Sequence, residues 1–105
     1  MKIETLLRAY EYDVSNPMGL GRFEVLNMLN NRDVLEELKR QMTTLQSTRL
    51  LIADEKLLAN SENIITECGS KRDFAKLRTH DPSPSSWWWY LEQVPVEYFV
   101  NTKVF

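Results

Sequence analysis

Residues 33–68 read DVLEELKRQMTTLQSTRLLIADEKLLANSENIITEC, a stretch that contains neither proline nor glycine and consists largely of helix-forming residues. Asp33 at its start is a suitable N-cap. A continuous helix of this length would measure about 50 Å, whereas a compact domain of this size has a radius of gyration of about 13 Å. The stretch therefore predicts a central helix that either breaks or projects from the domain and pairs with another helix.

The apolar side chains of this stretch change face along a helical wheel. One face carries six of them: Val34, Leu35, Leu38, Met42, Leu45 and Ile52. The leucines at 50–51 and 57–58 fall outside that face, which favours a break. The favoured turn is at residues 60–63, because Asn and Ser side chains compete with the helix for backbone hydrogen bonds. Residues 46–48 are the second candidate.

Two further helices are predicted on the N-terminal side. Residues 2–14 form an amphipathic pattern whose apolar face carries Ile3, Leu6, Leu7, Tyr10 and Val14. Turn-forming residues at 15–21 end this helix, and the glycines at 19 and 21 supply backbone freedom there. A short helix is then expected over residues 22–30, with Asn30-Asn31 as its stop.

On the C-terminal side, Gly69 is suited to the position after a helix that ends at Cys68. Ser70 and Asp73 resemble a capping box for a further short helix with Phe74 and Leu77 on its buried side. A loop containing Pro82 and Pro84 follows.

Trp87-Trp88-Trp89-Tyr90 places four aromatic side chains in a row, and neither a helix nor a strand turns four consecutive side chains toward one face. At least one ring is therefore expected to point away from the core. Ser86 is a candidate cap for a helix from Trp87 to Val94, and residues 96–100 alternate as an edge strand does.

Together these patterns predict an all-α fold, a small bundle of four to five helices with one long or broken central helix. The bundle occupies residues 1–80. An aromatic C-terminal extension, residues 81–105, belongs to the same single domain and has the patterns of a short helix and an edge strand.

Composition argues against several classes of protein. The 105 residues carry a formal charge of −2, which argues against a strongly basic nucleic-acid binder or a polybasic membrane-surface protein. The single cysteine, Cys68, excludes an intramolecular disulfide framework and favours a reducing compartment. With neither a secretory signal pattern nor a long apolar run, a cytoplasmic, soluble protein is expected.

Catalytic and metal-binding patterns are scarce. One cysteine and one histidine are too few for a zinc site without acidic partners, so neither a metal nor a cofactor is predicted. Cys68 is interpreted as a small buried side chain, and His80 as a surface histidine in a loop. A small enzyme that uses Cys68 or His80 is the third hypothesis, after the two that follow.

The favoured hypothesis is a non-enzymatic interaction module, an adaptor or a regulator or inhibitor of a larger protein partner. Trp and Tyr are frequent among the residues that contribute most to binding energy, so six residues are candidate partner-binding residues: Trp87, Trp88, Trp89, Tyr90, Tyr98 and Phe99. The face of helix 33–59 is a second candidate surface, with homodimerisation as one possibility. The competing structural interpretation is that Trp87, Trp89 and Tyr90 fold back and seal the core.

The alternative hypothesis is a protein that binds single-stranded nucleic acid. Four basic residues are its candidate phosphate contacts: Lys71, Arg72, Lys76 and Arg78. The aromatic rings would then stack on exposed bases. The negative charge of the whole chain opposes this hypothesis.

Overall fold

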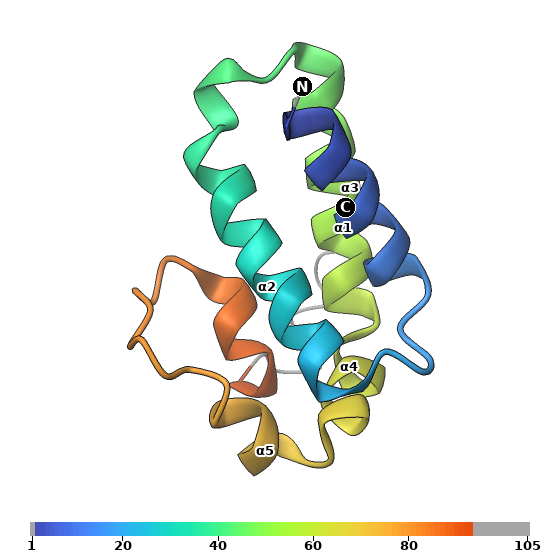
Figure 1. Cartoon of the computed structure of the whole chain (residues 1–105), viewed down its shortest axis with the longest axis vertical. Helices are drawn as coiled ribbons and strands as arrows, with labels where there is room; N and C mark the ends of the chain where they lie inside the picture. Colours follow the sequence, from blue (N-terminus) through green and yellow to red (C-terminus); the bar gives the residue numbers. More distant parts are fainter. Residues whose placement is uncertain (1, 94–105) are drawn as a thin grey trace, which may run out of the picture.

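The computed structural model of the protein describes residues 2–93, all of which lie in helices and the loops between them (Figure 1). The α-helices in this range are α1 (Lys2–Ser15), α2 (Gly21–Glu37), α3 (Thr44–Ala59), α4 (Ser61–Cys68) and α5 (Lys71–Ala75). Two 3₁₀-helices accompany them, η1 (Lys39–Gln41) and η2 (Trp87–Gln93). The predicted all-α bundle is confirmed. The edge strand expected at 96–100, with Tyr98 and Phe99, lies outside the described residues.

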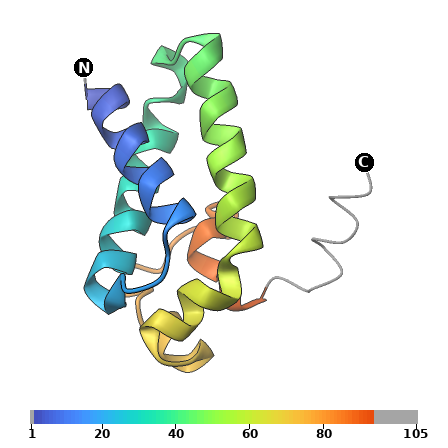
Figure 2. The same ribbon diagram turned by 90° about the vertical axis from the view of Figure 1, so that its right-hand side faces the viewer.

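Helix α1 packs against both α2 and α3, whereas α2 and α3 make few direct contacts with each other. The short elements α4 and α5 lie at the end of the bundle opposite η1 (Figures 1 and 2). Helix η2, in the C-terminal extension, contacts α2, α4 and α5. Within residues 2–93, no helix combines the length and the apolar character that crossing a membrane requires.

The first break in the 33–68 stretch lies earlier than residues 46–48. Helix α2 passes through Asn30-Asn31 and ends at Glu37, so Asp33 is an interior residue and not an N-cap. Thr43 begins α3 with a capping box: its hydroxyl accepts from the Gln46 N–H, and the Gln46 side chain accepts from the Thr43 N–H, both at 3.1 Å. Gln46 therefore stabilises the start of a helix and does not break one.

The second break, at Asn60, is where the sequence predicts it. Helix α3 ends at Ala59 and α4 begins at Ser61. The Asn60 side-chain amide donates a 2.8 Å hydrogen bond to the carbonyl of Val14. This bond fixes the turn against the C-terminal end of α1.

Two features of the structure require glycine at position 69. Its φ of 113° lies in the region that side chains disfavour, and a Cβ there would come within 2.5 Å of Asp73 Oδ2. Ser70 caps α5 by accepting from the Asp73 N–H at 3.1 Å. The predicted helix end and cap are thus both present.

The core is built from every α-helix and from η2. Fully buried side chains come from α1 to α5 and η2: Leu7, Tyr10, Val14, Val25, Met28, Leu29, Leu35, Leu57, Ile64, Phe74 and Trp89. Of the six apolar residues on the predicted face, only Leu35 belongs to the buried core, whereas Val34, Leu45 and Ile52 are exposed. The predicted face fails because it spans the break between α2 and α3.

An ion-pair cluster joins α1 to α3. Arg49 contacts Glu4 at 3.0 Å and Glu11 at 2.6 Å. Hydrogen bonds from Arg49, Gln46 and Arg8 lower the pKa of Glu4 from 4.5 to about 2. Glu4 therefore stays ionised in the folded protein at a pH that protonates it in the unfolded chain.

Acidification is expected to weaken the fold through this cluster. Because the pKa of Glu4 is lower in the folded state, its stabilising contribution is complete above about pH 4.5 and is lost as the pH falls toward 2. Urea denaturation between pH 5 and pH 2 should show a smaller loss of stability in Arg49→Gln than in the wild type. Arg40→Gln, which removes the same charge from exposed η1, is the control. Identical pH profiles for wild type and Arg49→Gln would contradict this role of Glu4.

Candidate functional site

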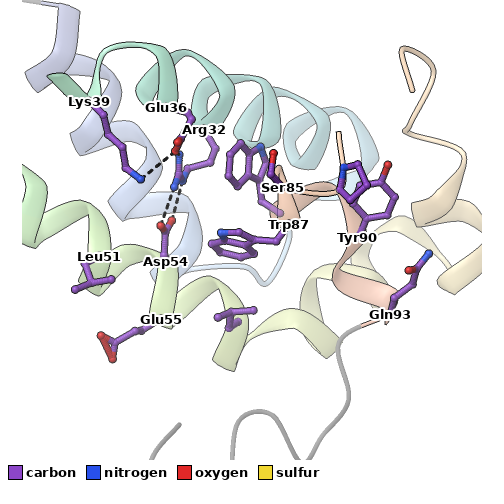
Figure 3. Close-up of a pocket in the computed structure, with 13 residues that line it drawn as sticks. Arg32, Glu36, Lys39, Leu51, Asp54, Glu55, Ser85, Trp87, Tyr90 and Gln93 are labelled. Carbon is purple, nitrogen blue, oxygen red and sulfur yellow. Dashed lines mark hydrogen bonds and ion pairs between the residues drawn. The ribbon is translucent and has the colours of Figure 1, made fainter. Parts of the chain in front are cut away.

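A groove of about 1000 Å³ lies between α2 and α3 and is bordered at one end by η2 and the loop before it (Figure 3). Its apolar lining consists of Leu51, Leu58, Pro84, Trp87, Trp88 and Tyr90. Its polar lining consists of Arg32, Glu36, Lys39, Asp54, Glu55, Ser85 and Gln93. The groove thus combines apolar side chains with charged groups from both helices.

A buried ion pair bridges the two helices within the groove. Arg32 of α2 binds Asp54 of α3 through two parallel hydrogen bonds, Nε to Oδ1 and Nη2 to Oδ2, each 2.9 Å long. The Tyr10 hydroxyl of α1 donates to Asp54 Oδ1 at 2.7 Å. Arg32 also donates to Glu36 Oε1 at 2.9 Å. This cluster therefore ties together the three longest helices of the described chain.

The cluster does not titrate near neutral pH at either Arg32 or Tyr10. Burial alone would lower the pKa of Arg32, but hydrogen bonds to Asp54 and Glu36 raise it overall. Burial, together with the charge of Asp54, raises the pKa of Tyr10 well above its ordinary value. Tyr10 thus remains a hydrogen-bond donor, and Arg32 remains a cation.

The tryptophans attach η2 to α2. The indole N–H groups of Trp88 and Trp89 both donate to Asp33 Oδ1, each at 2.8 Å. The Arg32 guanidinium carbon lies 4.1 Å from the centroid of the Trp88 ring, and Trp87 meets that ring edge-on at 5.6 Å. Trp88 consequently packs against the buried ion pair.

The four consecutive aromatic side chains divide into two pairs. Trp88 and Trp89 are 2% and 0% exposed, so they belong to the core and are not exposed contact residues. Trp87 and Tyr90 are half-buried and line the groove. The predicted helix to Val94 is instead a 3₁₀-helix kinked at Tyr90, and the Tyr90 hydroxyl donates to the Pro82 carbonyl.

Of the three rings expected to seal the core, Trp89 is fully buried, whereas Trp87 and Tyr90 pack against the core and stay half-buried. Trp88, which is not among the three, is buried as well.

The four basic residues do not form one exposed patch. Arg78 binds the Glu92 carboxylate at 2.7 and 2.8 Å, donates to the Trp89 carbonyl at 2.8 Å, and lies 4.5 Å from the Tyr90 ring centroid. Lys71, Arg72 and Lys76 are exposed on and beside α5. Arg78 therefore holds η2 in place.

His80 and Cys68 lie in different surroundings. Cys68 is 2% exposed, and burial raises the pKa of its thiol to about 11. His80 is exposed, and its ring meets Trp89 edge-on at 4.6 Å. Its Nε2 lies 3.9 Å from Asp33 Oδ2, which is longer than a hydrogen bond.

Across residues 2–93, no group of three or more His, Cys, Asp or Glu side chains is placed to hold a metal ion. The sequence interpretation missed both Arg32 and Asp54. A signal was present, because Asp54 shares the helical spacing of the buried Leu50, Ala53 and Leu57.

Comparison of the chain with protein-family models, with curated proteins and with solved structures found no match.

Proposed function

We propose that this protein is a non-enzymatic interaction module, an adaptor or regulator that binds an amphipathic helix of a larger protein partner between α2 and α3. The observation that carries the proposal is the groove itself, which lies where a fourth helix would complete a bundle with α1, α2 and α3. Helices that bind in such grooves insert apolar side chains spaced three or four residues apart.

The apolar lining supplies the contact surface for such a helix. Leu51 is 61% exposed although it lies in the middle of α3, and Leu58 and Trp87 are partly exposed beside it. Burying a leucine fully contributes about 1.5 to 3 kcal/mol. A partner helix that covers Leu51 and Leu58 therefore gains binding energy from side chains that the free protein leaves in water.

The charged lining favours a protein partner with polar residues only at its margins. Arg32 is already bound by Asp54 and Glu36, so the base of the groove offers few free polar groups to an occupant. Lys39 of η1 and Glu55 of α3 are both exposed, and the Lys39 ammonium also pairs with Glu36 Oε1 at 3.2 Å. These two residues are suited to setting the orientation of a bound helix through charge complementarity.

The nucleic-acid hypothesis has less support. Arg78 is engaged with Glu92, and the rings of Trp88 and Trp89 are buried, so neither phosphate contact nor base stacking is available from them. The groove carries three carboxylates against two cations, which disfavours a polyanion. Homodimerisation through 33–59 remains a proposal, although this segment is divided between α2, η1 and α3.

Partner capture with two matched variants tests the proposal. Leu51→Arg places a charge in the groove, and Ile52→Arg places the same charge on the next residue of α3, which is 48% exposed and does not line the groove. From a nuclease-treated lysate, we expect one protein to be retained by wild type and Ile52→Arg and lost with Leu51→Arg.

The dissociation constant of the partner segment that binds should rise at least about tenfold in Leu51→Arg, which corresponds to about 1.4 kcal/mol. Binding of that segment as a synthetic peptide should also increase its helicity, measured by circular dichroism. Equal retention by both variants would overturn the groove as the binding site.

A further inference from the structure

Negative charge is concentrated around the groove. A smaller cavity of about 320 Å³ lies between α2 and the loop 80–86, and it adjoins the groove because Glu36 and Trp88 line both. The cations that line the two cavities are Arg32 and Lys39. The carboxylates are those of Asp33, Glu36, Glu37, Asp54 and Glu55. With His80 neutral, this lining carries a formal charge of −3, whereas the whole chain carries −2, so the remainder of the chain is not acidic.

Two of the five carboxylates are already bound by the two cations. Arg32 binds Asp54 through two hydrogen bonds of 2.9 Å and donates a third to Glu36. Lys39 Nζ lies 3.2 Å from Glu36 Oε1. In Figure 3 the Glu55 side chain stands apart from these contacts. Neither cation of the lining is therefore free to attract an acidic occupant.

The other three carboxylates lack a cationic partner within residues 2–93. Neither Glu37 nor Glu55 forms an ion pair there, and both are exposed. Asp33 accepts both indole N–H groups through Oδ1, and its Oδ2 lies 3.9 Å from His80 Nε2, beyond hydrogen-bond distance. Asp33 and Glu37 are one turn apart on α2, so they share a face. A cavity lined by one sign of charge attracts ligands of the opposite sign.

We propose that the helix bound by this groove is basic. Its apolar side chains cover Leu51 and Leu58. Its Lys or Arg side chains pair with Glu55 on one side and with Asp33 and Glu37 on the other. This inference rests on the proposed function, because it specifies the chemistry of the same partner. Opposite charges beside an apolar contact speed association and exclude wrong partners, since an acidic helix would place like charges together.

Two synthetic helical peptides, titrated against the full-length protein, test this inference. Both are about 18 residues long, carry leucine at every third or fourth position and are otherwise built from alanine with either lysine or glutamate. Fluorescence anisotropy of a fluorescein label gives the dissociation constants. We expect the lysine peptide to bind at least about tenfold more tightly than the glutamate peptide. Raising the salt concentration from about 50 mM to about 500 mM should reduce this ratio.

Two matched double variants locate the attraction on the molecule. Glu37→Gln with Glu55→Gln removes two carboxylates of the lining. Glu24→Gln with Glu62→Gln removes two exposed carboxylates that line neither cavity, so the net charge of the two variants is equal. Circular dichroism first establishes that both are folded. The dissociation constant of the lysine peptide should rise at least about threefold in the first variant and less than about twofold in the second.

Three outcomes would overturn the inference: no binding of the lysine peptide, equal binding of the two peptides, or equal effects of the two double variants. The proposed function fails in a different experiment, when Leu51→Arg retains the same proteins as Ile52→Arg. A partner captured through Leu51, together with equal binding of the two peptides, would keep the groove as the binding site and remove only its preference for a basic helix.

Discussion

Asp54→Ala is expected to lower the free energy of unfolding by about 3 kcal/mol or more. The substitution leaves the Arg32 side chain, which is 2% exposed, without the carboxylate that accepts two of its hydrogen bonds. Tyr10 loses its acceptor as well. Glu36 remains bound to Arg32, but its side chain is 44% exposed, so it compensates only part of the buried charge.

Urea denaturation measures this effect against two further variants. Glu55→Ala removes the same charge from an exposed residue of the same groove and should change stability by less than about 0.5 kcal/mol. The combination Arg32→Met, Asp54→Leu and Tyr10→Phe replaces the whole cluster by apolar side chains. It should recover most of the lost stability, because no buried charge or hydroxyl is then left unpaired. A triple variant as unstable as Asp54→Ala would contradict this account.

Trp89→Ala is expected to cost about 3 to 5 kcal/mol, the range for removing a large aromatic side chain from a core. Trp89 is 0% exposed, and its indole N–H binds Asp33 at 2.8 Å. Its backbone carbonyl also accepts from Arg78. Loss of the ring therefore leaves a cavity and removes one of the two indole bonds that hold η2 on α2.

Thermal unfolding of a series at residues 87 and 89 separates these contributions. Trp87→Ala removes an equally large ring from a half-buried position and should cost clearly less than Trp89→Ala. Trp89→Phe keeps most of the packing and loses the hydrogen bond of the indole N–H. Its stability is therefore expected to lie between those of the wild type and Trp89→Ala. Equal losses of stability for Trp87→Ala and Trp89→Ala would contradict the expectation that the more deeply buried ring contributes more to stability.

The parts of the fold that the sequence predicts correctly are those with local causes. The turn at Asn60 and the helix end at Gly69 depend on side chains and backbone angles within a few residues. The start of α3 has a local signal too, the capping box of Thr43 and Gln46. The nearby Ser47 and Thr48 suggested a break there instead, which placed the turn a few residues too late.

The candidate site is less predictable because its contacts join distant parts of the chain. Helical spacing places Asp54 on a buried face and therefore implies a partner. That the partner is Arg32 depends on how α2 and α3 pack, which no local pattern specifies. Likewise, the sequence predicts that four adjacent aromatic side chains diverge. Asp33, an interior residue of α2, binds the two indoles that turn inward.

The two indole hydrogen bonds to Asp33 can form only late in synthesis, because their donors are added to the chain long after α2. Arg32 and Asp33 are added to the chain with α2, and Asp54 follows. Trp88 and Trp89 are added 34 and 35 residues after Asp54. At about 5 to 20 residues per second, this interval lasts about 2 to 7 s. During that time the Asp33 carboxylate has neither indole donor, and Arg32 lacks the Trp88 ring that packs on it. The described domain therefore closes only when its last helix has been translated.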